Sequence, residues 1–146
     1  MGHVIAGLTL TPLSILPAAD GEVLHGIRAD SAGFRGFGEA YFSTVGYRAV
    51  KAWKRHRLMT LNIVVPVGEI RFVIHDDRSG SASNGATQDF VLSRDNYKRL
   101  TVPPGVWMGF QGLGGELNLL LDVTDMPHDP SEADRCAVDA IGYDWT

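Results

Sequence analysis

The densest group of side chains that could do chemistry lies in residues 50–57, VKAWKRHR, which contain Lys51, Lys54, Arg55, His56 and Arg57. The 146-residue chain as a whole is acidic, with a formal net charge of -4 at pH 7. One explanation for this basic segment is protective, because lysines on an edge strand prevent pairing with another sheet. The alternative is that the positive charges face an anionic ligand.

The flanks of this segment favour an extended strand, in which alternate residues share a face. Lys54 and His56 then point to one side, and Lys51, Trp53 and Arg55 point to the other. An unpaired Lys is costly to bury in a small barrel, so an inward Lys54 would meet an anion, a carboxylate or water in a cavity. The other interpretation has Lys54 in solvent and Trp53 in the core. The strand pattern alone leaves both interpretations open.

Other segments also contain aromatic or ionisable side chains. Residues 102–112 lead through Pro-Pro-Gly into a strand with Trp107, whose simplest role is core packing. Residues 123–130 hold His128 between two prolines, and a lone histidine in a loop is more often structural than catalytic. Tyr41, on another strand-like segment, could supply a phenolic acid, although packing is again the simpler explanation.

The rest of the chain favours an all-β fold. Seventeen Gly and seven Pro favour many turns, among them a tight connection at Gly68. Ten segments are rich in β-branched or aromatic residues and mostly alternate in polarity. They are residues 4–10, 22–29, 38–45, 49–56, 60–67, 69–76, 87–93, 98–103, 105–111 and 117–124. Short strands separated by turn signals are typical of a sandwich or barrel, so we expect a small all-β barrel and a single domain over residues 1–146.

One or two short helical turns are also expected. Residues 92–99 contain a first candidate, with Ser93 as its cap. Residues 129–135 contain a second, with Pro130 in the first position and Asp129 as the cap.

Composition narrows the classes of partner. The mild acidity argues against a general nucleic-acid binder. The apolar run over residues 4–19 is interrupted by prolines, lacks a basic start and is too short to cross a bilayer, so we expect no membrane partner. Cys136 is the single cysteine, which excludes an intrachain disulfide and makes the cytoplasm the expected compartment.

Taken together, the strand segments resemble the dTDP-4-dehydrorhamnose 3,5-epimerase family of cupin-like barrels. The segments that carry the resemblance are FGEAYFSTV, VKAWKRH, LNIVVPVGEIRFVIHDDR, LSRDNYKRLTVPPGVWMGFQGL and TDMPHDPSEADR, in this order and spacing. The resemblance covers nearly the whole chain from Leu10 onward. It implies a cupin-like (jelly-roll) barrel, usually a homodimer, with a site for a dTDP-linked or similar nucleotide-diphosphate sugar at the barrel mouth and no cofactor.

The family's chemistry removes a proton from the carbon next to the C4 ketone and returns it to the opposite face. That needs a base, an acid and a positive group for the enolate oxygen. The family's base is a His in a strand motif like RGLH, and our alignment places Lys51 at the Arg and Lys54 at the His. The family's acid is a Tyr in the segment that matches TDMPHDP, where the equivalent expected here is His128 or no residue at all. The chain also ends at Thr146, before the tail in which longer members carry an Asp that supports the His.

A metal is not expected, although many cupins hold iron or manganese through three His and a Glu. The first metal motif would need His-x-His, and the chain has Lys54, Arg55 and His56 there. The second would need a His at the position of Met108. One ligand of four does not hold a metal.

The resemblance therefore predicts an isomerase or epimerase of a nucleotide-linked 4-keto-6-deoxy sugar that acts in deoxysugar or surface-polysaccharide biosynthesis. The expected catalytic residues are Lys54, in place of the base His, together with His56 and His128. The expected substrate-binding residues are Lys51, Trp53, Tyr41, Glu39, Arg28 and Trp107. Two alternatives stay open: a non-catalytic cupin that binds a nucleotide sugar, and a ketoisomerase that moves the carbonyl between C3 and C4.

Overall fold

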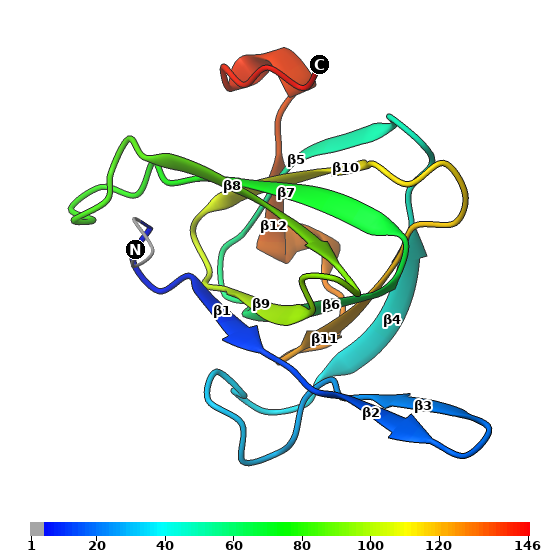
Figure 1. The fold of residues 1–146 in the computed structure, drawn as a ribbon. Helices are drawn as coiled ribbons and strands as arrows, with labels where there is room; N and C mark the ends of the chain where they lie inside the picture. The colour runs from blue at the N-terminus through cyan, green and yellow to red at the C-terminus, as the bar shows by residue number, and fades with distance from the viewer. Residues whose placement is uncertain (1–4) are drawn as a thin grey trace.

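The computed structural model describes residues 5–146, which form two facing antiparallel sheets and a projecting hairpin (Figure 1). Sheet I has the order β1 (Thr9–Pro12), β9 (Lys98–Val102), β6 (Leu61–Val67), β11 (Leu119–Thr124) and β4 (Glu39–Thr44). Sheet II has the order β12 (Ala133–Arg135), β5 (Val50–His56), β10 (Trp107–Gly112), β7 (Glu69–His75) and β8 (Thr87–Ser93). The hairpin consists of β2 (Ile15–Ala18) and β3 (Gly21–Leu24), and two short 3-10 helices are η1 (Pro130–Glu132) and η2 (Val138–Ala140).

The main core lies between the two sheets because alternate residues of each strand point inward. Ile63 and Val65 of β6 and Phe72 and Ile74 of β7 are almost fully buried there. Val73, which lies between the last two and points the other way, belongs to a second cluster on the outer face of sheet II. This two-sheet arrangement is a jelly-roll barrel, and it confirms the all-β expectation.

A single glycine carries the chain from sheet I to sheet II. β6 ends at Val67 and β7 begins at Glu69, so Gly68 is the whole connection. Its φ is +80°, in the left-handed region that favours glycine. A Cβ at this position would lie 2.3 Å from the carbonyl oxygen of Leu117. The tight connection expected at Gly68 is therefore confirmed, and both its backbone angle and its surroundings require glycine.

β5 contains an irregularity that changes which side chains share a face. Lys54 pairs with Met108, and Lys51 pairs with Phe110. The two β5 residues are three positions apart but their β10 partners are only two apart, so β5 contains one extra residue here. An extra residue of this kind reverses the alternation of side chains. Lys51 consequently lies on the same side of the sheet as Lys54, whereas simple alternation placed it on the opposite side.

The C-terminal segment covers the outer face of sheet II (Figure 1). Ile141, Tyr143 and Trp145 pack on the second hydrophobic cluster, which includes Trp53 and Val73. The Trp145 and Trp53 rings lie 5.5 Å apart between centroids. The segment therefore buries the side of β5 that faces away from the barrel interior.

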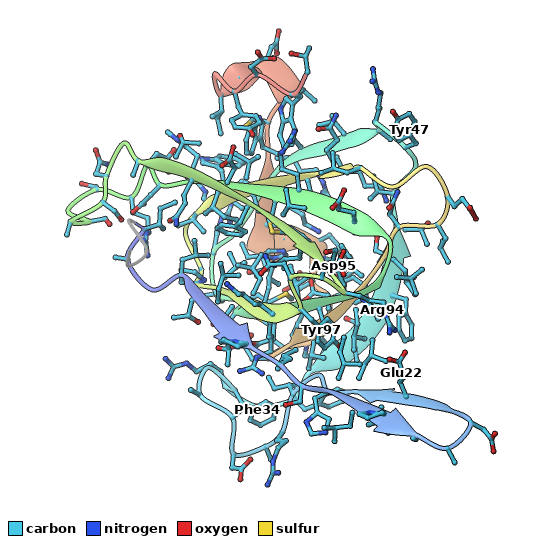
Figure 2. The ribbon with its side chains drawn as sticks, in the orientation of Figure 1. Glu22, Phe34, Tyr47, Arg94, Asp95 and Tyr97 are labelled. Carbon is cyan, nitrogen blue, oxygen red and sulfur yellow. The ribbon has the colours of Figure 1, made fainter. Side chains whose placement is uncertain are left out.

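The β2–β3 hairpin projects from the opposite end of the molecule and is tied back by the β8–β9 connection. Arg94 forms an ion pair with Glu22 of β3, and both residues are labelled in Figure 2. The hydroxyl of Tyr97 donates a 2.6 Å hydrogen bond to the carbonyl oxygen of His25, just after the hairpin. These contacts fix the base of the hairpin against sheet I.

The expected strands from residue 38 onward are all present within a few residues of their predicted limits. The helical turn at residues 129–135 is confirmed as η1, in which the carboxylate of Asp129 accepts from the N–H of Ser131 at 3.0 Å. Residues 92–99 form a turn rather than a helix, although the Ser93 hydroxyl does accept from the N–H of Asn96 at 3.3 Å.

Two expected strands in the first part of the chain need correction, and three elements were not expected. The strand expected over residues 22–29 ends at Leu24, because the segment that follows leaves the hairpin. β2, β12 and η2 were not expected from the sequence. The strand expected over residues 4–10 starts later, at Thr9, and its first residue lies outside the described part of the chain. The expectation of a single domain over residues 1–146 stays a prediction.

Candidate functional site

A pocket with a volume of about 350 Å³ opens between the two sheets. This size lies in the range of small-molecule sites. Both sheets supply its walls, and its lining includes the apolar side chains of Ile63, Met108 and Leu120. The polar side chains that line it are Tyr41, Ser43, Lys51, Lys54, His56, Asp122, Arg135 and Cys136.

The wall formed by sheet II is basic. Lys54 and His56 of β5 both face the pocket, which is the inward orientation considered for Lys54 from the strand pattern. Lys51 lies nearer the surface, where its Nζ donates a 2.7 Å hydrogen bond to the carbonyl oxygen of Thr44. Arg135, on the adjacent strand β12 opposite Lys54, adds a further positive charge.

His56 is oriented by a buried carboxylate. Its Nδ1 lies 2.7 Å from Oε1 of Glu132, whose side chain is only 2% exposed. Burial by itself would raise the pKa of Glu132, but the hydrogen bonds from His56 and from the N–H groups of Leu58 and Met59 outweigh it and lower that pKa. Glu132 is therefore ionised and can only accept, so Nδ1 of His56 donates. In the neutral imidazole the lone pair is then on Nε2.

The wall formed by sheet I is acidic. Asp122 of β11 is 3% exposed, and its Oδ2 accepts a 3.0 Å hydrogen bond from the hydroxyl of Tyr41 on β4. Burial raises the pKa of Asp122 to about 7, against the opposing effects of the Tyr41 hydrogen bond and the charge of Lys54. Burial and the neighbouring carboxyl likewise raise the pKa of Tyr41.

The charge state of Lys54 depends on its burial and on charged groups of β11, η1 and β12. Burial lowers the pKa of Lys54, and the charge of Arg135 lowers it further. Glu132 and Asp122 act in the opposite direction and favour the ammonium. The net direction is downward, as a half-buried lysine beside another cation should show.

The other side chains expected to bind substrate lie around or away from this pocket. Trp53 touches the pocket, but its indole is buried in the outer cluster and donates to the carbonyl oxygen of Val138 at 3.0 Å. Trp107 lies outside the pocket lining, where its Nε1 donates to Asp77 at 2.9 Å and Arg55 stacks on its ring.

Three more expected residues are not brought into the pocket. His128 is exposed in the loop after β11, and its N–H donates a 2.8 Å hydrogen bond to the carboxylate of Glu39. Arg28 is exposed and pairs with Asp30 at 2.9 Å, away from the pocket lining. The structure therefore joins Lys51, Lys54, His56 and Tyr41 in one site and leaves Glu39, His128, Arg28 and Trp107 outside its lining.

Sequence reasoning missed the acidic half of the site. Asp122 interrupts the apolar run LNLLLDVT, and a lone carboxylate in an otherwise buried strand is a signal that could have been used. Glu132 and Arg135 lie in a segment expected only to form a turn. Their approach to β5 depends on the pairing of β12 with β5, which no local pattern reveals.

Within residues 5–146 no group of three or more His, Cys, Asp and Glu side chains is arranged to hold a metal ion. The absence of a metal stays a prediction. No helix in this part of the chain is long and apolar enough to cross a membrane.

Comparison with solved structures supports the fold throughout the chain. A crystal structure described as a dTDP sugar isomerase, from Desulfovibrio desulfuricans G20, is 45% identical and superposes with a TM-score of 0.94 over 97% of this chain and 92% of that one. A dTDP-4-dehydrorhamnose 3,5-epimerase from Sulfolobus tokodaii is 21% identical, with a TM-score of 0.83 over 97% of this chain and 84% of that chain. At this lower identity the likeness shows the fold.

Curated relatives and a family profile agree with this picture. A probable low-salt glycan biosynthesis epimerase of Haloferax volcanii, Agl13, is 32% identical over 72% of this chain, and the match spans 66% of its own length. The spore coat polysaccharide biosynthesis protein SpsL of Bacillus subtilis is 27% identical over 82% of each protein. The profile of the dTDP-4-dehydrorhamnose 3,5-epimerases matches residues 51–146, which include β5, β10, β11 and β12 of the pocket. The chain belongs to the dTDP-4-dehydrorhamnose 3,5-epimerase family.

Proposed function

We propose that this protein epimerises a nucleotide-linked 4-keto-6-deoxy sugar, with a dTDP sugar as the substrate class, in the biosynthesis of a surface glycan. Membership of the family supports the reaction type, and two relatives are described as proteins of glycan or polysaccharide biosynthesis. The reaction removes a proton from a carbon next to the C4 ketone, forms an enolate and returns a proton to the opposite face. No redox cofactor is needed, because the oxidation state of the sugar does not change.

The observation that carries the proposal is the His56–Glu132 pair in a pocket that also contains Lys54. Glu132 fixes the proton of His56 on Nδ1, so the Nε2 lone pair is available to take a proton from the sugar carbon. The carboxylate that orients the imidazole comes from Glu132 of η1.

We assign the base to His56 rather than to Lys54. A lysine needs a pKa far below its ordinary value of about 10.4 to be neutral at pH 7. Burial lowers the pKa of Lys54, but Glu132 and Asp122 both favour its charged form. A charged Lys54 instead polarises the C4 ketone and holds the enolate oxygen, which is the electrostatic part of the reaction. Lys51 and Arg135 supply positive charge for the diphosphate.

The test is proton NMR of dTDP-4-keto-6-deoxyglucose incubated with the protein in D2O. We expect loss of the signal of the C3 or C5 proton as solvent deuterium enters. His56→Asn should slow this exchange by about 10²- to 10⁴-fold, the usual contribution of a general base. Lys54→Met should also slow it, because the enolate oxygen loses its positive partner.

His75→Asn is the matched control, because His75 is bonded to Thr87 at 2.7 Å and lies outside the pocket lining. It should leave exchange unchanged. Exchange that persists in His56→Asn but vanishes in Lys54→Met would return the role of base to Lys54. Binding of the sugar without any exchange in the wild type would contradict the enzymatic function and favour a non-catalytic nucleotide-sugar-binding cupin. A product with its carbonyl at C3 would identify a ketoisomerase.

We further propose that the protein works as a homodimer in the cytoplasm. The β2–β3 hairpin exposes the cross-strand pair Leu16 and Val23, and Phe42 on the edge strand β4 is 66% exposed. Exposed apolar groups of this kind suit an interface with a second copy. Light scattering coupled to size-exclusion chromatography checks this, and a monomer mass at micromolar concentration would contradict it. The single Cys136, which excludes an intrachain disulfide, supports a reducing compartment.

A further inference from the structure

Asp122 is a buried acid that has no role in the proton removal described above. Its Oδ2 accepts a hydrogen bond from the hydroxyl of Tyr41. Among residues 5–146 its Oδ1 is buried and has no hydrogen-bond partner. A buried carboxyl oxygen without a partner is costly, and in native structures such a group needs a specific explanation. Asp122 lines the pocket, so a ligand that enters the pocket lies against this side chain.

The position of Asp122 relative to His56 matches what inversion at carbon requires. His56 lies on β5 of sheet II, and Asp122 lies on β11 of sheet I, so the two side chains reach the pocket from opposite walls. Inversion needs a proton removed from one face of the sugar ring and another delivered to the opposite face. A sugar bound between the sheets would present one face to each wall.

The residue expected to deliver that proton is not placed to do so. His128 is exposed beyond the end of β11, and its N–H is bonded to Glu39. Tyr41 lines the pocket, but its hydroxyl already donates to Asp122, and its pKa is raised by burial and by that neighbour. A phenol that holds its proton so tightly is a poor acid at neutral pH.

We propose that Asp122, in its protonated form, is the catalytic acid that delivers the second proton. Tyr41 is a positioning residue, which donates to Oδ2 and thereby fixes the orientation of the carboxyl group. The proposal rests on the proposed function, because it assigns the second proton of that same reaction. The groups that face Asp122 are Tyr41 and Glu39 of β4, Lys54 of β5 and the backbone of Asn62 on β6.

The step balances without an added reagent. Nε2 of His56 takes the proton as the C–H bond breaks, and the electron pair moves to the ketone oxygen as an enolate held by Lys54. The enolate then forms a new C–H bond on its other face with the proton of Asp122, which is left as a carboxylate. Water returns a proton to Asp122 and takes one from His56, so the enzyme is restored. The pKa of about 7 keeps a substantial fraction of Asp122 protonated at neutral pH.

The experiment separates exchange from inversion in Asp122→Asn. Asn keeps the shape and its amide oxygen still accepts from Tyr41, but it has no acidic proton to give. In D2O, His56 can still remove the proton and return deuterium to the same face. We therefore expect deuterium incorporation within a few-fold of the wild type, while the rate at which the inverted sugar appears falls by about 10²-fold or more.

Three controls make the outcome decisive. Asp95→Asn removes an exposed carboxylate on the β8–β9 connection, seen in Figure 2, and should change neither rate. Thermal unfolding and dTDP binding of Asp122→Asn show whether the fold and the pocket are kept. Tyr41→Phe should keep the inverted product but shift the pH profile of its formation, which a merely structural tyrosine would not do.

Each other result overturns the inference in a recognisable way. Inversion by Asp122→Asn at the wild-type rate would show that another group is the acid. If Asp122→Asn folds and binds dTDP but has lost both deuterium exchange and inversion, the carboxyl acts in proton removal instead. Exchange without inversion in the wild type would overturn the acid and leave the enolising function standing. No exchange in the wild type would instead contradict the proposed function itself.

Discussion

Asp122 is held in a setting that opposes its charge. Its side chain is buried in β11, and only one of its two oxygens has a partner among the described residues. The pKa of about 7 means that the folded protein binds this proton much more tightly than the unfolded chain does. Above its ordinary pKa the carboxyl is ionised in the unfolded chain. In the folded protein it must either keep its proton or lose it at a cost in free energy, so it lowers the stability of the fold in that pH range.

This gives a pH-dependent prediction for the free energy of unfolding of Asp122→Asn. Below the ordinary pKa of about 3.8 both proteins are neutral at this position and should be similar. As the pH rises through 7 the wild type loses stability relative to the variant, by up to about 4 kcal/mol at 1.36 kcal/mol per pKa unit. Urea unfolding at pH 4 and pH 8 measures the difference. A variant that is less stable than the wild type at pH 8 would contradict the raised pKa.

Glu132 shows the opposite behaviour, because its hydrogen bonds favour the ionised form. It accepts from His56 and from the backbone N–H groups of Leu58 and Met59. Its lowered pKa makes a stabilising contribution that is present above the ordinary value of about 4.5 and is lost as the pH falls through the folded value.

Glu132→Gln should therefore destabilise the protein by about 1–3 kcal/mol at pH 7, as expected when buried donors lose a charged acceptor. The difference should shrink on acidification. The same variant should slow deuterium exchange by roughly tenfold or more, because His56 loses its orientation. Thermal unfolding at pH 7 and pH 3.5, with the NMR exchange assay, checks both effects. Unchanged exchange in a correctly folded variant would argue against His56 as the base.

At this scale the sequence identified the basic residues of the site but not the acidic ones. Lys54 and His56 stand in one unusual cluster, so composition alone drew attention to them. Asp122 and Glu132 are single carboxylates in ordinary surroundings, and their partners lie 81 and 76 residues away along the chain. Such long-range pairing is fixed by the fold rather than by any local pattern.

Among the elements, the connection between β6 and β7 is the most restrictive. Gly68 has a φ of +80°, and a Cβ there would meet the carbonyl oxygen of Leu117 at 2.3 Å. Gly80, in the loop before β8, has nearly the same φ of +79°, but a Cβ at that position would have nothing within 4 Å. Substitution of Gly80 therefore measures the backbone strain alone, whereas substitution of Gly68 measures the strain together with a steric clash.

Gly80→Ala should lower the free energy of unfolding by about 1–2 kcal/mol, the usual effect of a left-handed backbone on an L-residue. Gly68→Ala should lower it clearly further, because a rigid backbone atom must also move. Urea unfolding of both variants beside the wild type measures this. Equal effects would mean that the chain around Leu117 shifts freely to make room.

The strand β5 shows where element-level prediction reached its limit. Its existence and bounds were predicted well, and the alternation placed Lys54 and His56 on one face and Trp53 and Arg55 on the other. Lys51 was assigned to the wrong face, because the extra residue opposite β10 is not visible in the sequence. A bulge of this kind is a property of two paired strands together.

At the scale of the whole molecule, the C-terminal segment backs the catalytic strand. Trp145 packs on Trp53, which lies next to Lys54, and its ring also lies close to Gly109 of β10. The segment buries an apolar face of sheet II that would otherwise meet solvent. The position of Lys54 and His56 therefore depends on residues that lie outside the pocket.

Trp145→Ala should lower the free energy of unfolding by about 2 kcal/mol, less than a fully buried Trp because the ring is only partly covered. It should also weaken binding of dTDP through the loosened strand β5. Asp144→Asn alters an exposed side chain of the same segment and should do neither. Urea unfolding and calorimetric titration with dTDP measure the two effects. Loss of stability with unchanged affinity would show that β5 keeps its shape without the segment.

The order of the strands in the sheets has a consequence for how the protein is made. Tyr41 meets Asp122 through the pairing of β4 with β11, and β5 lies between β10 and β12. The partner strands β10, β11 and β12 all come late in the chain. A ribosome that has released the first hundred residues has therefore made Lys54 and His56 without the strands that enclose them. Topologies dominated by such distant contacts fold in milliseconds to seconds rather than microseconds. The pocket can therefore form only after β12 has been synthesised, and until β10 and β12 exist the strand that carries Lys54 and His56 lacks both of its neighbours in sheet II.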